Sequence, residues 1–374
     1  MRIVFILLIA AHGFTHLFGF LKAFEIAEFN TINQPISKAS GLFWLLTFLL
    51  FAITIIMVLI RSEYFWVCGL LALIISQILI FMYWSDAKFG TIVNLIILLV
   101  ILVAYSDYSF KNTIEKERKA LFKNSKNTNQ KIILKDDISD LPEIVQKWLI
   151  HSGVIGKPKT TNLCLTQELQ LKLKPEQTKW NKGTAEQYFT IQPPAFNWNI
   201  NTKMNSILGV TGRDKFVDGK GEIVIKLLSI IAVADEKNNE KIDQAALQRY
   251  LAEIVWFPSA SLSPYIEWES LDSNAAKATM QYKGTKGSGV FYFDENGQFK
   301  KFVAFRYKEA NDVKPKKWTV TATKTEERNG IKIPVECEVS WHLDTKQWTW
   351  LKLKIKYIEY NTEQIPVTNS VHKK

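Results

Sequence analysis

Two histidines near the N-terminus combine a residue type and a spacing that could do chemistry. His12 and His16 are four residues apart, so a helix would place them on one face. That helix would put them near the middle of a membrane span, where ionisable side chains are rare and often functional. The pair could bind a metal or a haem, or it could relay protons.

A structural role for this pair is the interpretation that we favour. A haem with two axial histidines would need one from a facing helix, and a transition metal would need more than two ligands. The remaining histidines all lie outside the apolar segments: His151, His342 and His372. The imidazoles would then hydrogen-bond a polar neighbour within the spans. The candidate neighbours are Gln77, Asn94 and Asp86. We therefore expect no bound metal and no cofactor.

A second constellation lies on a helical stretch of the C-terminal part. Arg249 and Glu253 form an i,i+4 pair, with Tyr250 and Trp256 beside them. Ligand pockets combine apolar walls with a few placed polar groups, so this pair could be a polar clamp at the mouth of a cavity. The alternative is an ordinary helix ion pair that contributes roughly 0.2–0.5 kcal/mol.

Three more residues, on strand-like segments, complete the candidate ligand-binding set: Trp198, Arg213 and Asp214. The chain has no His-Glu-x-x-His, nucleophile-elbow, dinucleotide or paired-cysteine motif, so we assign no catalytic residue. Whether the protein is an enzyme stays open, because acids of the C-terminal part could pair in space for acid–base work. These acids are Glu186, Asp214, Asp235, Glu253 and Glu338.

Four apolar runs occupy the first 106 residues and must position the histidines. They are Arg2–Phe20, Gly41–Ile60, Tyr64–Trp84 and Phe89–Ser106. Each is close to the roughly 20 residues that a helix needs to cross the hydrocarbon core of a bilayer. The first run lacks a convincing cleavage site and three further spans follow it, which favours a retained helix over a signal peptide. The sequence predicts a four-helix transmembrane region.

The formal net charge of +11 lies beyond these runs. Residues 1–110 hold five basic and five acidic residues, whereas residues 111–135 hold eight basic and two acidic ones. A basic segment directly after a span fits anionic lipid headgroups better than nucleic acid. Four spans put both ends of the membrane region on one side of the membrane. If that side is the cytoplasm, eight basic residues of the loops and ends lie inside and three lie outside. The positive-inside rule therefore predicts a multi-pass protein of the cell (inner) membrane with a cytoplasmic C-terminal domain.

In the C-terminal part, apolar residues recur at every second position. In residues 351–357, apolar residues alternate with lysines, as in a strand with one buried and one solvent-exposed face. The pairs Asn296-Gly297 and Asn329-Gly330 predict tight antiparallel hairpins. Helices are expected at 142–152 and at 243–256, the second capped by Asp243. We expect an α+β soluble domain of about nine to eleven strands, a mostly antiparallel curved sheet or half-barrel with one or two covering helices.

These patterns divide the chain into four parts. We expect a transmembrane region at 1–106, a basic connector at 107–135, a β-rich domain at 136–362 and a flexible tail at 363–374. The cysteines do not refine this division. Cys68 lies in a span, whereas Cys164 and Cys337 lie in strand-like segments. The latter two could pair across a sheet, although buried free thiols are favoured.

Several stretches resemble an uncharacterised bacterial membrane-protein family, a domain of unknown function. The run Arg249–Ala260 reads RYLAEIVWFPSA, and residues 141–149 read LPEIVQKWL. Gly212-Arg213-Asp214 and the N-terminal run AHGFTHLFGF at 11–20 belong to the same resemblance. The likeness covers nearly all of residues 140–360 and implies four N-terminal membrane helices followed by a β-rich domain. It implies no activity.

Three functions from different classes remain. The first is a membrane-anchored domain that binds a lipid or other apolar ligand in a curved, aromatic-lined sheet. The second is a membrane enzyme that acts on a lipid or envelope precursor, which would need carboxylates or histidines gathered in one cleft. The third is a structural or regulatory partner of another membrane protein. We favour the first, with membrane lipids as the expected partners, because it explains most features together.

Overall fold

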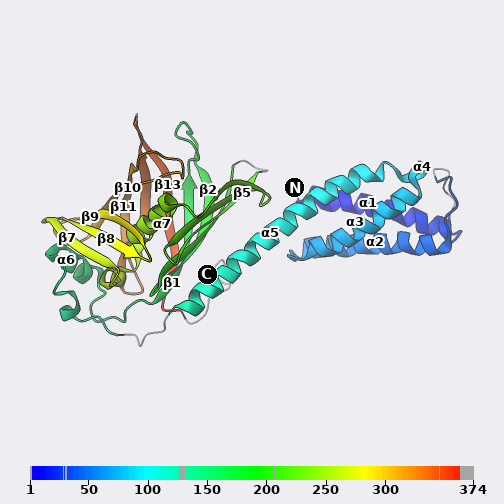
Figure 1. The fold of residues 1–374 in the computed structure, drawn as a ribbon. Helices are drawn as coiled ribbons and strands as arrows, with labels where there is room; N and C mark the ends of the chain where they lie inside the picture. The colour runs from blue at the N-terminus through cyan, green and yellow to red at the C-terminus, as the bar shows by residue number, and fades with distance from the viewer. Residues whose placement is uncertain are drawn as a thin grey trace. The chain divides into compact units, whose positions relative to one another are not determined.

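The computed structural model describes residues 2–27, 29, 32–125, 131–204, 208–344 and 346–362. The chain forms two compact units, Met1–Asn112 and Thr113–Lys374. The tail predicted at 363–374 lies outside the described residues, as does part of the predicted connector, 126–130. Figure 1 shows the helices of the first unit in blue to cyan and the strands of the second in green to red.

The first unit is built from antiparallel helices. Its elements are α1 (Arg2–Ala23), α2 (Lys38–Leu59), α3 (Phe65–Met82), α4 (Trp84–Ala87) and the beginning of α5 (Gly90–Asn124). The helices α1, α2, α3 and α5 are long and apolar enough to cross a membrane, as the four apolar runs predict. From Thr113 on, α5 belongs to the second unit, so much of the basic segment is helical.

Small residues let the first helices pack closely. A Cβ on Gly19 would lie 2.4 Å from the ring of Trp44, and a Cβ on Gly41 would lie 2.4 Å from Cβ of Ala23. Close approach at small residues is typical of helices that associate in a membrane, where burial of apolar surface gives no net driving force. The helices also expose large apolar side chains such as Phe81 and Leu99.

The second unit is organised by one antiparallel sheet of thirteen strands. The strands are β1 (Asn162–Leu171), β2 (Asn181–Ile191), β3 (Pro194–Lys203), β4 (Gly209–Val217), β5 (Lys220–Leu227), β6 (Ile231–Glu236), β7 (Ile266–Asp272), β8 (Ala275–Tyr282), β9 (Thr285–Phe293), β10 (Phe299–Arg306), β11 (Lys316–Arg328), β12 (Ile331–His342) and β13 (Gln347–Tyr360). Their spatial order is β6-β5-β4-β3-β2-β1-β13-β12-β11-β10-β9-β8-β7. The sheet is a meander in which β1 pairs with β13.

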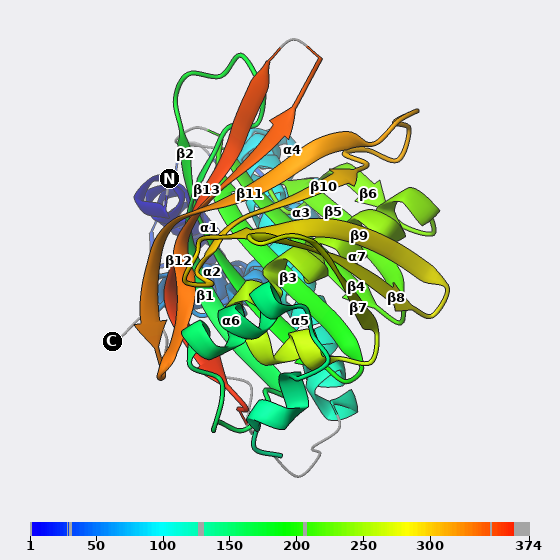
Figure 2. The same cartoon turned by 90° about the vertical axis from the view of Figure 1, so that its left-hand side faces the viewer.

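The sheet curls into a half-barrel, as Figures 1 and 2 show. Near its two edges, the turn between β4 and β5 meets the turn between β8 and β9. There the hydroxyl of Thr285 donates to the carbonyl of Gly219 over 2.7 Å, and Lys283 pairs with Asp218 at 2.5 Å. This contact joins two hairpins that lie far apart in the strand order.

The predicted count of nine to eleven strands was too low. The edge strands β6 and β7 are mostly exposed, with no regular alternation of buried and exposed residues. A period of two arises only where one face is buried, so such strands give a weak pattern. Both Asn-Gly hairpins are confirmed, since Gly297 lies between β9 and β10 and Gly330 between β11 and β12, each with a positive φ.

The helices of the second unit lie close to their predicted places. They are η1 (Lys135–Ile138), α6 (Glu143–Ser152), α7 (Glu240–Glu253), η2 (Ile254–Trp256) and η3 (Pro258–Leu262). The prediction of Asp243 as the cap of α7 was wrong. Asn239 caps the helix by accepting from the amide of Lys241 at 2.9 Å. Asp243 lies inside the first turn and is buried, where it accepts from the amide of Gly221 at 2.8 Å.

Helix α7 packs against strands of both halves of the sheet, β5 on one side and β9 on the other. Glycines make this possible. A Cβ on Gly221 would lie 2.6 Å from the carbonyl oxygen of Ile242, and one on Gly287 would lie 2.8 Å from the side chain of Gln248. The buried face of α7 joins the main hydrophobic core, which also includes α6 and the inner face of the sheet.

Replacing Gly221 tests this close approach. In Gly221→Ala the new methyl group would collide with backbone of α7, so the helix must shift, and such overpacking costs about 1–3 kcal/mol. Gly209→Ala is the matched control, because no atom lies within 4 Å of a Cβ built there. We expect chemical denaturation of the full chain to show a loss of unfolding free energy for Gly221→Ala only. Equal stability of the two variants would contradict the packing described.

Candidate functional site

The half-barrel encloses a cavity of about 660 Å³. Ligand pockets fall in the range of roughly 300–1,000 Å³, so this one can hold a ligand of moderate size. Its wall is mainly apolar. Six tryptophans line it: Trp198, Trp256, Trp318, Trp341, Trp348 and Trp350. Branched aliphatic side chains from β3, β5, β12 and β13 fill the spaces between them, among them Ile200, Ile225, Val339 and Leu353.

Strand alternation places most of these side chains. On β5, Ile223 and Ile225 line the cavity while Val224 between them does not. On β13 the alternation of inward and outward side chains is interrupted, because the consecutive residues Trp350 and Leu351 both line the cavity. The register of β12 against β13 shifts between Val339 and Ser340, which leaves Trp350 as the extra residue of a bulge. A bulge re-aims the side chains that follow it, and here it adds an aromatic ring to the wall.

A cluster of charged side chains lies in this wall, centred on Arg249 of α7. Its Nη1 donates to Oδ2 of Asp214 over 2.6 Å, and its Nε donates to Oε1 of Glu253 over 2.9 Å. The second oxygen of Glu253 accepts from the amide of Gln187 at 2.7 Å. The guanidinium also lies 4.5 Å from the ring centroid of Trp198, within cation–π range. One guanidinium thus holds two carboxylates.

Burial dominates the electrostatics of this cluster. It raises the pKa of Asp214 and of Glu253, although the nearby guanidinium of Arg249 opposes the shift in both. A second cation, Arg306 of β10, also lines the cavity. Burial and the neighbouring charge of Arg249 lower the pKa of Arg306 to about 10, so this side chain remains cationic at neutral pH.

The structure brings together five of the seven residues that we considered for ligand binding: Trp198, Asp214, Arg249, Glu253 and Trp256. Tyr250 does not line the cavity. It is buried in the core, and its hydroxyl donates to the carbonyl of Thr190 over 3.0 Å. Arg213 does not line it either, because it is the neighbour of Asp214 on β4 and faces the other side of the sheet.

Sequence analysis missed Arg306 and most of the tryptophans. The sequence does contain a pattern that indicates Arg306. This residue continues the alternate positions of Phe302 and Ala304, which are buried on the inner face of β10. An inward arginine at the end of an apolar strand indicates a polar site. The signal for Trp350 was absent, since only the bulge turns it inward.

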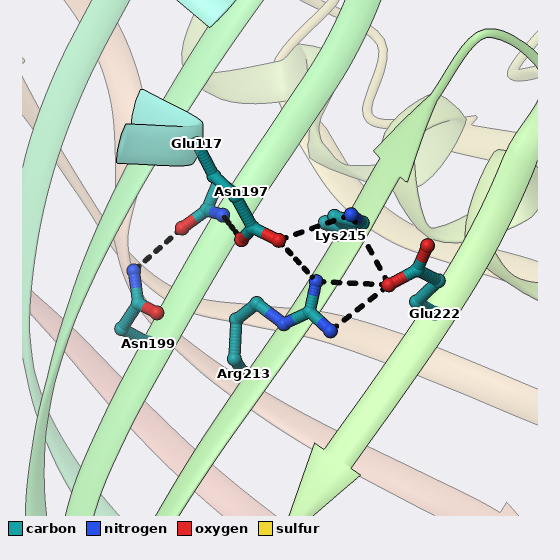
Figure 3. Close-up of polar contacts among 6 residues, drawn as sticks. All are labelled: Glu117, Asn197, Asn199, Arg213, Lys215 and Glu222. Carbon is teal, nitrogen blue, oxygen red and sulfur yellow. Dashed lines mark hydrogen bonds and ion pairs between the residues drawn. The ribbon is translucent and has the colours of Figure 1, made fainter. Parts of the chain in front are cut away.

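Arg213 belongs to an ionic cluster on the outer face of the sheet (Figure 3). Its guanidinium pairs with Glu117 of α5 at 2.8 Å and with Glu222 of β5 at 2.9 Å. Lys215 pairs with the same two carboxylates at 3.0 and 3.1 Å. The second oxygen of Glu117 accepts from the amide of Asn197 at 2.9 Å. The cluster fixes residue 117 of α5 to strands β3, β4 and β5.

A second contact fixes the next residue of α5. Arg118 pairs with Glu186 of β2 at 2.7 Å, and its guanidinium lies 4.2 Å from the ring centroid of Tyr188. The side chain of Arg118 is only 6% exposed. Buried, hydrogen-bonded pairs of this kind are costly to break, because removing one partner leaves a charge without compensation.

The two histidines of the first unit lie in a hydrogen-bonded network. Nδ1 of His16 lies 3.0 Å from the carbonyl of His12, so it is the protonated nitrogen, and its Nε2 accepts from the hydroxyl of Ser76 at 2.9 Å. Nε2 of His12 donates to Oδ1 of Asn94 over 2.9 Å, and the amide of Asn94 donates to Ser76 over 3.0 Å. This favours the structural role. Of the predicted partners, Asn94 contacts a histidine directly.

The other predicted neighbours serve elsewhere. Gln77 accepts from the amide of Asn94 at 3.0 Å, and Asp86 accepts from the backbone amides of Asn33 and Gln34. Among the described residues, no group of three or more His, Cys, Asp or Glu side chains is placed to hold a metal ion.

Cys164 and Cys337 are buried free thiols. They lie on β1 and β12, which are separated by β13 in the sheet. Burial raises the pKa of both thiols to about 12, and a thiol that stays protonated at neutral pH is a poor nucleophile and metal ligand. Neither cysteine therefore adds a reactive group to the site.

These features define a class of protein: helices able to span a membrane, followed by a half-barrel sheet that holds an aromatic-lined cavity. The chain belongs to the family of unknown function DUF6920, which matches residues 139–360. No curated protein matches the chain.

Two of the solved structures that are similar to this chain come from Nitrosomonas europaea and Brucella abortus. One is a LolA superfamily protein from Nitrosomonas europaea, with 8% identity, a TM-score of 0.31, and coverage of 62% of this chain and 96% of that one. The other is a β-barrel-like protein of the domain of unknown function DUF1849 from Brucella abortus. It has 12% identity, a TM-score of 0.21, and coverage of 55% of this chain and 99% of that one.

The outer cluster predicts a pH dependence of stability. Burial acts to raise the pKa of Glu222, but Lys215 and Arg213 outweigh it, so this pKa is lowered from its ordinary value of 4.5. Because the folded state favours the ionised form, the contribution of Glu222 is complete above pH 4.5 and is lost as pH falls through the lowered pKa. Glu222→Gln should reduce the unfolding free energy by roughly 1 kcal/mol at pH 7 and by progressively less towards pH 3.

Chemical denaturation of the full chain at a series of pH values measures this difference. Glu269→Gln is the control, since Glu269 is 64% exposed and pairs with the exposed Lys277. A deficit for Glu222→Gln that stayed constant down to pH 3 would contradict an ionic contribution.

Proposed function

We propose that this protein is a membrane-anchored binding protein that holds a lipid or another apolar ligand in the cavity of its half-barrel. The observation that carries the proposal is the cavity itself. It combines about 660 Å³ of space, six tryptophans and a compact charged cluster. This is the composition expected of a ligand site, in which an apolar wall supplies affinity and a few polar groups supply orientation.

The energetics of packing support this interpretation. Protein interiors are close-packed, and voids much larger than a water molecule are few. An empty apolar cavity lowers stability, because the atoms that line it lose their dispersion contacts. A ligand that occupied this cavity would restore those contacts.

The enzyme alternative needs acid–base groups gathered in one cleft. Asp214 and Glu253 do lie together in the cavity wall, but both are hydrogen-bonded to Arg249. Arg249 and Gln187 occupy both oxygens of Glu253, and Arg249 occupies one oxygen of Asp214, so few of these oxygens are free to take a proton from a substrate. The cluster therefore suits orientation and binding better than proton transfer.

The proposal includes a location. The four apolar helices would anchor the protein in the cell membrane, and the basic residues near the ends of the spans favour a cytoplasmic C-terminal domain.

Reporter fusions after Lys374 test the location. We expect an alkaline phosphatase fusion, which is active only outside the cytoplasm, to give no signal, and a green fluorescent protein fusion to fluoresce, because of the charge bias of the spans. The control is a pair of fusions after Ile60, where a chain truncated after two spans should give the same result. Phosphatase activity at Lys374 would place the domain outside.

The binding function is tested by filling the cavity. Ile225 lines it and is half-buried, so Ile225→Trp adds an indole to the enclosed space. Val224→Trp is the matched control, because it makes the same change on the same strand without lining the cavity. Native mass spectrometry of the full chain released from detergent, with extraction of bound lipid, measures occupancy.

We expect the unmodified protein and Val224→Trp to carry a lipid-class ligand at a defined stoichiometry, and Ile225→Trp to carry several-fold less. Lipid that binds the helices is common to all three proteins, so the difference reports the cavity alone. Identical lipid content in the two variants would show that the bound lipid lies elsewhere.

A further inference from the structure

Arg306 differs from the other arginine of the cavity wall in its partners. Arg249 pairs with two carboxylates, whereas Arg306 forms no ion pair with any residue that the structure describes. Its one hydrogen bond to those residues runs from Nε to the carbonyl of Ala245, over 2.8 Å. The terminal Nη groups of Arg306 donate no hydrogen bond to any residue of the described ranges.

Two tryptophans hold this guanidinium in place. Its central carbon lies 4.8 Å from the ring centroid of Trp318 and 5.7 Å from that of Trp341. Cation–π contacts of this length orient the planar group but accept none of its hydrogen bonds. Arg306 is therefore oriented at the cavity wall, with unused donors.

The nearby acids do not provide the missing acceptors. Asp214 and Glu253 attract Arg306 electrostatically, but neither lies within ion-pair distance of it and both are already bound to Arg249. A guanidinium carries five N–H donors, and the half-buried side chain of Arg306 uses one of them on the residues that the structure describes. A ligand with an anionic, two-oxygen head would supply both acceptors and charge, because carboxylate and phosphate match the guanidinium fork.

We infer that the cavity binds an anionic amphiphile, with its carboxylate or phosphate head on Arg306 and its apolar chain along the aliphatic and tryptophan wall. The inference rests on the proposed function and specifies the ligand class of the same site. Arg306 and the apolar wall belong to one continuous cavity, so a head and a chain can be bound together. A neutral lipid would leave the terminal donors of Arg306 unpaired.

Photolabelling of the full chain in detergent tests the inference. The probes are a diazirine-bearing fatty acid and the fatty alcohol of the same chain, which differ only in the charge of the head. Cross-linked tryptic peptides identified by mass spectrometry separate labelling of the cavity strands from labelling of the helices. We expect the acid to label peptides of β5 and β11–β13 at concentrations about tenfold lower than the alcohol, as a charge-assisted hydrogen bond allows.

Variants of Arg306 test whether this residue causes the preference for the acid. Arg306→Met should remove the preference for the acid, and Arg306→Lys should keep part of it, because the charge remains while the fork is lost. Continued labelling of the cavity by the alcohol shows that each variant is folded. Arg328→Met is the control, since Arg328 lies on β11, is 39% exposed and pairs with Glu326.

The outcomes separate the two proposals. Absence of cavity labelling by either probe in the unmodified protein would overturn the proposed function and the inference with it. Equal labelling by acid and alcohol would leave a cavity that binds apolar ligands and overturn the anion selectivity alone. A preference for the acid that persists in Arg306→Met would overturn the role of Arg306.

Discussion

The contact of α7 with both halves of the sheet is the constraint on which the rest of the second unit depends. Gly221 on β5 and Gly287 on β9 lack the side chains that would hold the helix away. Asp243 then binds the amide of Gly221, and Gln248 donates to the carbonyls of Ser288 and Phe305. These hydrogen bonds satisfy buried and partly buried backbone groups that a helix at greater distance would leave without this partner. Because α7 lies inside the curl, it closes one wall of the cavity and carries Arg249 into it.

The charged clusters on the two faces of the sheet use adjacent residues of the same strands. On β4, Arg213 binds Glu117 of α5 while Asp214 binds Arg249 of α7. On β2, Glu186 binds Arg118 while Gln187 binds Glu253. Successive side chains of a strand point to opposite faces, so the cavity cluster and the anchor of the end of α5 are separated by the thickness of one sheet. Both clusters are partly shielded from solvent, which strengthens their ion pairs.

Much of the fold could be predicted because it rests on local patterns. The apolar runs, the Asn-Gly turns and helix α6 all lie where their residues indicate. The predictions that failed concern features without a strong local pattern. The edge strands β6 and β7 are exposed and lack a buried face, and the cap of α7 was assigned to Asp243 because its contact with Gly221 is invisible from spacing. Among the candidate ligand residues, Arg213 and Asp214 were both included. They are consecutive on one strand, so their side chains point to opposite faces of the sheet and only one of them can line the cavity.

The chain by itself determined the division into apolar helices and a β-rich domain, since both follow from hydrophobic periodicity within a short window. It also determined that Arg306 lies in phase with the inner face of its strand. Only the tertiary structure decided which side chains share the cavity, because strands from both halves of the sheet contribute to one wall and a bulge at Trp350 reverses the local phase. It alone decided that, among the residues described, Arg249 has carboxylate partners and Arg306 has none. Ion pairing depends on distances between strands and helices that no sequence spacing specifies.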